Sequence, residues 1–185
     1  MGRITGPILA LDLGIASGFA RGAPGDAPQS GTVQLKKTSE LIDVAYGNLI
    51  AFLCEEFGRQ LPAMVVKERM LYLQAFTSLG TSEKTIRAHA AYHGIVEGLC
   101  VRYGVRWEDV SPSTFRRHFI GAANAGSRDE TKQAVVDRCH LLKLMPADCR
   151  DDNRADAIAV WDWAAATFGR RVPADLHLFG ERKHA

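Results

Sequence analysis

The sequence has no long hydrophobic run. Among its 185 residues, no stretch approaches the roughly 18 consecutive apolar residues that a membrane-spanning helix needs. The N-terminal residues 1–4 do not begin a charged segment followed by a long apolar core, which is the pattern of a secretion signal. These absences predict a cytoplasmic protein that makes no contact with a membrane.

The chain also has no strong excess of charge of either sign. Its 23 Lys and Arg residues are balanced by 21 Asp and Glu residues, which gives a formal net charge of +2. Bulk charge therefore neither indicates nor excludes a nucleic-acid partner, and only the local distribution of charge is informative. With 46% apolar and 24% charged residues, the composition is that of a globular protein.

The length fits one domain better than two. We expect a single domain over residues 1–170 and a C-terminal tail over residues 171–185. A chain of this size disfavours enzymes that bind their substrate between two lobes.

Cysteine is scarce, and its spacing does not suit metal binding. The four cysteines, at positions 54, 100, 139 and 149, include no C-x-x-C pair. Cys54 and Cys100 fall inside amphipathic helical patterns, which favours buried free thiols over zinc ligands or disulfides.

The order of apolar runs and amphipathic stretches predicts an α/β domain. Strands are expected at 7–12, 18–21, 31–35, 63–69 and 105–110. Helices are expected at 39–57 with Ser39 as N-cap, at 82–103 opened by Ser82, at 129–142 and at 152–168, with a short turn at 115–119. The first three strands suggest an antiparallel meander and the later ones a right-handed parallel crossover, so the sheet should be mixed.

Two of the predicted buried strands end in a carboxylate. Asp12 follows the apolar run at 8–11, and Glu68 follows the run at 64–66 after one lysine. An ionised carboxylate at the end of a buried strand is costly unless water, cations or a metal ion compensates it. If the two strands are neighbours, these side chains converge and can share a divalent cation.

A third group of oxygen donors opens the last predicted helix. Asp152, Asn153 and Asp156 share one face of it, because residues three or four apart on a helix point the same way. The apolar run at 157–161 would anchor this helix on the sheet and aim its start at the strand ends. Such a donor set suits two-metal hydrolysis of phosphodiesters, in which one ion activates the attacking water and the other stabilises the leaving oxygen.

Each of these acids also has a plainer interpretation. Asp12 could accept backbone hydrogen bonds from the turn that follows it. Asp152 could be the N-cap of the last helix. Glu68 could form an ion pair with Lys67 or Arg69. We favour a shared metal site because it explains all of the acids together.

Several segments of the chain occur in a characteristic order. They are Ile8–Gly14 with Ser17 and Gly18, Val65–Glu68, Ser111 and Pro112 with Arg116 and Gly121, Lys132, and Asp152–Ala159. Together they resemble the RuvC-type Holliday-junction resolvases of the ribonuclease-H-like superfamily, over about residues 6 to 168. The resemblance implies a mixed five-stranded sheet flanked by α-helices, a homodimer, and Mg²⁺- or Mn²⁺-dependent nicking of four-way DNA junctions.

The resemblance also implies roles for individual residues. Asp12, Glu68 and Asp156 match the family's catalytic, metal-binding carboxylates. Three residues before the last of these the family has Asp or His, whereas this chain has Asn153, whose amide oxygen can bind a hard cation but carries no charge. Asp152, one position earlier, could compensate as a metal ligand.

The expected DNA contacts lie between residues 115 and 150. This segment has seven basic and four acidic residues, a local excess of three positive charges. The basic pair that contacts the scissile strand in the resembling family matches Arg116 and Lys132. With Arg117, these side chains would neutralise phosphates and make binding weaken with salt.

An apolar, aromatic segment follows Glu68. In the resembling family an aromatic side chain of this region wedges into the base pairs of the junction. Tyr72 and Phe76 could do so by stacking on bases. The alternative is that they pack under the loop or across a dimer contact.

The sequence therefore predicts a metal-dependent endodeoxyribonuclease that resolves four-way or other branched DNA in recombination and repair, without an organic cofactor. One alternative is a protein of the same fold that binds junctions without cutting them, because Asn153 replaces an acid. Another is a fragment of an actin-like ATPase with Asp12–Gly14 in its phosphate loop. That interpretation lacks a second glycine-rich loop and a second lobe.

Overall fold

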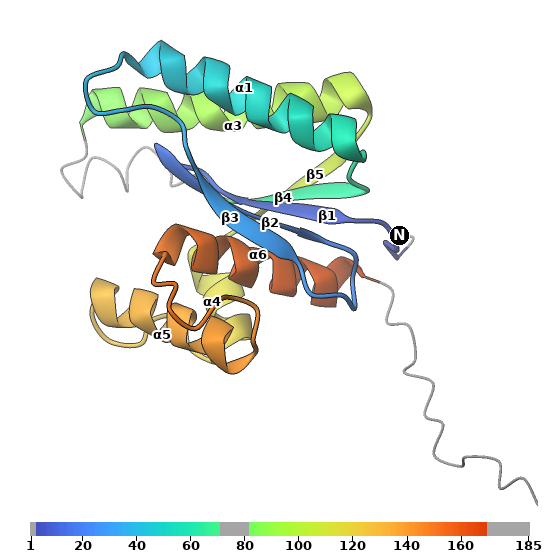
Figure 1. Cartoon of the computed structure of the whole chain (residues 1–185), viewed down its shortest axis with the longest axis vertical. Helices are drawn as coiled ribbons and strands as arrows, with labels where there is room; N and C mark the ends of the chain where they lie inside the picture. Colours follow the sequence, from blue (N-terminus) through green and yellow to red (C-terminus); the bar gives the residue numbers. More distant parts are fainter. Residues whose placement is uncertain (1–2, 71–81, 170–185) are drawn as a thin grey trace, which may run out of the picture.

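The structure is a computed structural model that describes residues 3–70 and 82–169. In this part of the chain, one mixed sheet separates two layers of helices (Figure 1). Helices α1 (Ile42–Arg59) and α3 (Glu83–Tyr103) cover one face of the sheet, and α6 (Asp152–Phe168) lies on the other. Helices α4 (Pro112–Ile120) and α5 (Arg128–Leu141) pack on α6. The predicted α/β fold class is confirmed.

The sheet has five strands in the order β3-β2-β1-β4-β5. Their bounds are β1 (Ile8–Asp12), β2 (Ala16–Gly22), β3 (Gln29–Gln34), β4 (Met64–Glu68) and β5 (Arg106–Val110). The first three strands form an antiparallel meander, whereas β4 is parallel to both β1 and β5. The mixed sheet expected from the order of the elements is therefore present.

The parallel pairing brings the ends of β1 and β4 to one edge of the sheet. Leu11 is the register partner of Lys67, so Asp12 and Glu68, one residue further along each strand, end side by side. Glu68 is itself paired with Val110 at the end of β5. The carboxyl ends of parallel strands are where open α/β sheets commonly form their binding sites.

Both faces of the central strands are buried. Along β1, Ile8 and Ala10 pack into the apolar cluster beneath α6, while Leu9 and Leu11 pack into the cluster beneath α1 and α3. Successive side chains of a strand point to opposite faces, so a strand covered on both faces has a continuous apolar sequence. This arrangement explains the uninterrupted run at 8–11 that predicted β1.

The predicted helix caps have different outcomes. Ser82 caps α3, because its side chain accepts a hydrogen bond from the N–H of Thr85. The predicted cap at Ser39 is wrong: α1 begins at Ile42 and has no side-chain cap. Residues 37–40 instead close a separate hydrogen-bonded turn ahead of the helix.

The segment predicted as a short turn at 115–119 belongs to a longer helix, α4. Ser111 caps this helix through the N–H of Thr114. Pro112 takes the first helical position, where a missing N–H costs no hydrogen bond. The Ser-Pro pair is a helix-start signal that the prediction did not use.

All four cysteines are free thiols. Cys100 and Cys139 are buried, whereas Cys54 and Cys149 are partly exposed. Of the helices that the structure describes, none has the length and apolar character needed to cross a membrane. The tail predicted at 171–185 lies outside the described residues.

Candidate active site

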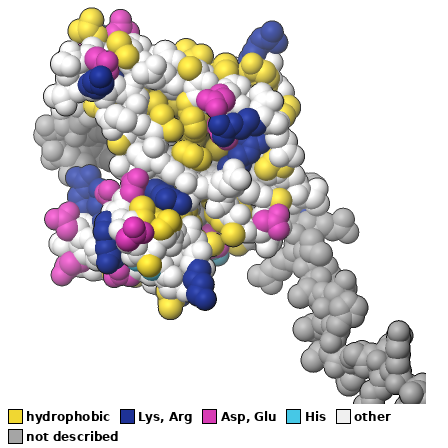
Figure 2. All heavy atoms as spheres, in the orientation of Figure 1, with side chains coloured by type: hydrophobic (Ala, Val, Ile, Leu, Met, Phe, Trp, Pro, Cys, Tyr) yellow, Lys and Arg dark blue, Asp and Glu magenta, His cyan; other side chains and the backbone are white. Residues whose placement is uncertain are grey.

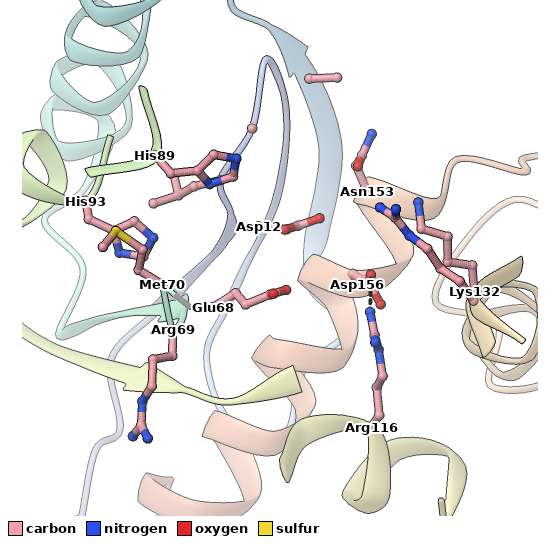
Figure 3. Close-up of a pocket in the computed structure, with 14 residues that line it drawn as sticks. Asp12, Glu68, Arg69, Met70, His89, His93, Arg116, Lys132, Asn153 and Asp156 are labelled. Carbon is pink, nitrogen blue, oxygen red and sulfur yellow. Dashed lines mark hydrogen bonds and ion pairs between the residues drawn. The ribbon is translucent and has the colours of Figure 1, made fainter. Parts of the chain in front are cut away.

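A pocket of about 380 Å³ opens at the edge of the sheet where β1 and β4 end. Asp12 from β1, Glu68 from β4 and Asp156 from α6 all line it. In Figure 3 the carboxylates of Asp12 and Glu68 extend toward the start of α6, where Asp156 is joined to Arg116. Asn153, one helical turn before Asp156, lines the pocket as well. The structure therefore brings four of the five predicted metal ligands together.

The first turn of α6 aims Asn153 and Asp156 at this edge of the sheet. Asp151 is the N-cap of the helix and accepts a backbone hydrogen bond, so the interpretation of Asp152 as the cap is wrong. Residues 155–161 are all buried, which fixes the helix on the sheet. Asp156 is only 5% exposed.

The close approach of α6 to β2 depends on a glycine. A Cβ atom on Gly18 would lie 1.9 Å from the backbone oxygen of Asn153. The neighbouring Ser17 is buried, and its hydroxyl accepts from the N–H of Gly14 and donates to the carbonyl of that residue. Ser17 thus fixes the turn after Asp12, and Gly18 allows the start of α6 to pack against β2. Because the N–H of Gly14 donates to Ser17, it is not the donor to Asp12 that the plainer interpretation of Asp12 suggested.

Basic side chains pair with the acids of α6. Arg116 of α4 donates to Asp156 Oδ2 over 3.1 Å, and Lys132 of α5 forms an ion pair with Asp152. Burial acts to raise the pKa of Asp152, but the hydrogen bond and charge of Lys132 lower it overall. Asp152 is thus turned to Lys132 and is not among the side chains that line the pocket, whereas Lys132 is.

Glu68 does not pair with its basic neighbours in the sequence. Lys67 points to the opposite face of the sheet, where it is fully buried beneath α3. Figure 3 shows Arg69 extending away from the three acids. The interpretation of Glu68 as half of a local ion pair is therefore wrong.

Burial raises the pKa values of all three acids, and repulsion by neighbouring carboxylates adds to this effect. The pKa of Asp12 is raised well above its usual value, first by burial and then by the charges of Glu68 and Asp156. Burial, followed by the charge of Asp156, raises the pKa of Glu68 to about 7. Burial also raises the pKa of Asp156, although Arg116 and Lys132 oppose this. The site thus concentrates negative charge that a cation would relieve.

The donors present fit a hard divalent cation. Carboxylate and amide oxygens are the ligands that Mg²⁺ and Mn²⁺ prefer. Asp156 Oδ1 is buried and has no hydrogen-bond partner among the described residues. Within residues 3–70 and 82–169, however, no three His, Cys, Asp or Glu side chains are close enough together to bind one metal ion. Arg116 occupies the second oxygen of Asp156.

The predicted basic contacts to DNA fall in two places. Arg116 and Lys132 line the pocket, together with Arg128, which belongs to the basic segment 115–150 but was not named as a specific contact. Arg117 is exposed on α4 and is not among the lining residues. On the face drawn in Figure 2, basic and acidic side chains are interspersed over α5, so this face has no continuous basic surface.

The α3 side of the pocket was not predicted. His89 and His93, four residues apart on α3, line it, and Lys67 contacts His93 from within the sheet. The spacing of the two histidines, and a lysine inside an apolar strand, were the available signals. Tyr72 and Phe76, predicted to contact DNA, lie outside the described residues.

No protein-family model and no curated protein matches the sequence. Solved structures do match the fold. RuvC from Thermus thermophilus is 19% identical, with a TM-score of 0.62 over 86% of this chain and 93% of that one. T. thermophilus RuvC in complex with a Holliday junction substrate is 18% identical, with a TM-score of 0.62 over 86% and 92% of the two chains. The yeast mitochondrial Holliday junction resolvase Ydc2 is 14% identical, with a TM-score of 0.57 over 89% and 80%.

These likenesses cover most of each chain, so they concern the whole described domain and not one motif. At this level of identity they establish architecture. They agree with the five-stranded mixed sheet and its two helical layers. The chain therefore has the ribonuclease-H-like fold of the RuvC-type Holliday junction resolvases, as its motifs predicted.

Proposed function

We propose that this protein is a metal-dependent endodeoxyribonuclease that hydrolyses phosphodiester bonds in branched DNA, with the four-way junction as its substrate. The observation that carries the proposal is the convergence of Asp12, Glu68 and Asp156 from three elements far apart in the sequence. Buried like charges destabilise a fold unless a ligand compensates them, and such groups cluster at functional sites.

Asp12, Glu68 and Asp156 are the proposed metal ligands, and Asn153 is an uncharged fourth donor. Bound Mg²⁺ or Mn²⁺ would lower the pKa of a water molecule and offset the negative charge of the phosphate. Asp152 has another role in this proposal, because its carboxylate holds Lys132 at the pocket.

The cations beside the acids are the proposed contacts to the DNA backbone. Arg116, Arg128 and Lys132 line the same pocket as the carboxylates, so they can bind the phosphate that the acids would act on. Arg117 on the exposed surface of α4 would extend this contact. The structural likeness to RuvC in complex with a Holliday junction substrate supports branched DNA as the ligand. A homodimer with two such pockets could cut two strands of one junction.

Cleavage of a synthetic four-way junction tests the proposal, with Mg²⁺ or Mn²⁺ and with linear duplex and single-stranded DNA beside it. We expect cleavage of the junction alone. Asp12→Asn should slow it by at least about a hundredfold, because loss of a ligand costs more than loss of an outer contact. Asp43→Asn, at an exposed position in α1, is the matched control and should cut like the wild type. An Asp12→Asn protein as fast as the wild type would refute the mechanism.

One observation favours a second function, a junction-binding protein that does not cut. Where the resembling family has Asp or His, this chain has Asn153, so the pocket offers a cation one negative charge fewer than a site with Asp there. This alternative predicts tight binding to the junction and no cleavage with either metal. It also predicts that Asn153→Asp produces cleavage where the natural chain has none.

A further inference from the structure

A fully buried lysine lies behind the pocket. Lys67 of β4 is on the sheet face covered by α3, and its side chain has no exposed surface. Its Nζ lies 3.0 Å from Glu97 Oε1 and is ion-paired with Asp109 of β5. The same atom lies 4.7 Å from the centroid of the Trp107 ring. Two carboxylates and an aromatic face thus hold this ammonium in one position.

His93 of α3 is a hydrogen-bond partner of this ammonium, beside Asp109. Lys67 Nζ lies 3.0 Å from His93 Nδ1. A lysine ammonium has three donor hydrogens and no acceptor, so Nδ1 must be the unprotonated nitrogen that accepts. A neutral imidazole then carries its single proton on Nε2.

His93 connects this buried cluster to the pocket. The residue is 8% exposed and lines the pocket with Asp12 and Glu68. Figure 3 shows its ring extending from α3 toward the acids. With Nδ1 bound to Lys67, Nε2 is the nitrogen that remains for the pocket.

The surroundings oppose a second proton on this ring. Burial, and then the charge of Lys67, lowers the pKa of His93 to about 4, although Asp109 acts in the opposite direction. A cationic imidazole would have its charge 3.0 Å from the ammonium. The ring is therefore neutral near neutral pH.

We propose that Lys67 locks His93 in the Nε2-protonated form, so that the ring offers the pocket a neutral hydrogen-bond donor for a phosphate oxygen of bound DNA. The role toward DNA rests on the function proposed above. A protonated Nε2 has no free lone pair for a cation, so the same lock keeps His93 out of the metal-ligand set. Lys67 is the positioning residue, and His93 contacts the substrate.

The position of the proton can be measured without DNA. Long-range ¹H–¹⁵N spectra of the ¹⁵N-labelled full chain distinguish the two neutral tautomers, and His93→Gln assigns the signal by removing it. We expect a protonated Nε2 and an unprotonated Nδ1 in the wild type at neutral pH. Lys67→Met should give a mixture of tautomers. A wild-type proton on Nδ1 would overturn the proposal, whether or not Lys67→Met folds.

A second buried ion pair provides the matched control. Glu56 of α1, which is 3% exposed, pairs with Arg21 over 3.0 Å on the same side of the sheet and is not among the pocket-lining residues. Glu56→Gln should leave the His93 spectrum unchanged. A mixture of tautomers in this variant would mean that any loss of a buried ion pair changes the tautomer of His93. Lys67 would then have no specific role, and the proposal would fail.

Cleavage kinetics test the contact with DNA. His93→Leu removes the donor, whereas His93→Gln retains one. We expect His93→Leu to lower kcat/KM about tenfold to a hundredfold, the usual effect of a lost hydrogen bond to a charged group. His93→Gln should stay within about threefold of the wild type, because the amide still donates.

The two proposals fail in distinguishable ways. If the wild type cuts junctions and His93→Leu cuts them equally fast, the contact with DNA is refuted and the nuclease assignment stands. If the wild type cuts no DNA, the proposed nuclease function is refuted, and the spectra still decide where the proton lies. Binding to the junction then tests the contact with DNA: equal affinity of His93→Leu and the wild type would refute it.

Discussion

Lys67 and Glu68 are neighbours on β4, yet the ionic clusters around them, on opposite faces of the sheet, are built differently. On the α3 side one buried ammonium is bound by Glu97, Asp109 and the ring of His93. The two carboxylates are partly exposed, and the one fully buried charge is the ammonium that they pair with. The buried charge of this cluster is therefore compensated without any ligand.

On the α6 side the charge is not balanced. Asp12, Glu68 and Asp156 lie together, and their pKa values are raised although Arg116 and Lys132 are close by. One buried oxygen of Asp156 has no partner among the described residues. Burial of charge is thus not in itself a sign of a functional site, whereas burial of unbalanced charge of one sign is.

Removing one charge from each cluster should have opposite effects on stability. Lys67→Met leaves two carboxylates unpaired, so we expect the free energy of unfolding to fall by about 2 to 3 kcal/mol, since both are partly exposed and regain water. Glu68→Gln should raise it by on the order of 2 kcal/mol at about pH 8, because the neutral amide avoids the cost of burying a charge and the repulsion by Asp156, which together raise the pKa of Glu68.

Urea unfolding in the presence of a metal chelator measures both changes. If both variants lose stability, the acids are balanced in the metal-free protein, and the contrast between the two clusters disappears. If both variants gain stability, Lys67 destabilises the folded protein.

Disrupting the contact between α6 and β2 should have a smaller effect on stability. Gly18→Ala forces a Cβ atom onto the backbone of Asn153, so we expect a loss of about 1 to 3 kcal/mol as the helix start is displaced. Affinity for Mn²⁺, measured by calorimetry, should fall with it because Asp156 moves too. Gly47→Ala in α1 is the control, since a Cβ there meets no atom within 4 Å. It should stabilise the helix by about 0.5 to 1 kcal/mol. Unchanged Mn²⁺ affinity in Gly18→Ala would show that the contact between α6 and β2 does not position the metal-binding residues.

The smallest effect is on the pH dependence of stability without metal. The pKa of Glu68 is about 7 in the folded chain and 4.5 in its ordinary state, so between these values the folded chain binds more protons than the unfolded chain. Stability contributed by Glu68 is therefore complete below about pH 4.5 and is lost as pH rises through about 7. We expect a loss of about 1 kcal/mol between about pH 6 and 8. This loss of stability should be absent in Glu68→Gln and reduced by Mg²⁺. If the free energy of unfolding of Glu68→Gln falls equally with pH, other groups are responsible for the loss.

Local sequence was sufficient for the strands that carry the acids. The ends of β1 and β4 were predictable because an apolar run that stops at a carboxylate is a local pattern. The cap at Ser39 was not, because a residue that caps a helix also suits a turn, and hydrogen bonds between Lys37 and Glu40 form that turn.

The composition of the site was only partly predictable. Helical spacing directs both Asp152 and Asn153 toward the face of Asp156, and only the contact with Lys132 from α5 draws Asp152 away. The bond between Lys67 and His93 likewise depends on how α3 packs on β4. No local pattern contains that information, because it arises from tertiary packing.

The position of α6 against β1 and β2 also has a consequence for the order of synthesis. The first two strands leave the ribosome early, whereas the helix that carries Asp156 is the last described element of the chain. Asp12 and Glu68 therefore lack their third partner until α6 has been synthesised. A nascent or truncated chain without α6 has only an incomplete pocket, so the three acids come together only after this helix has packed on the sheet.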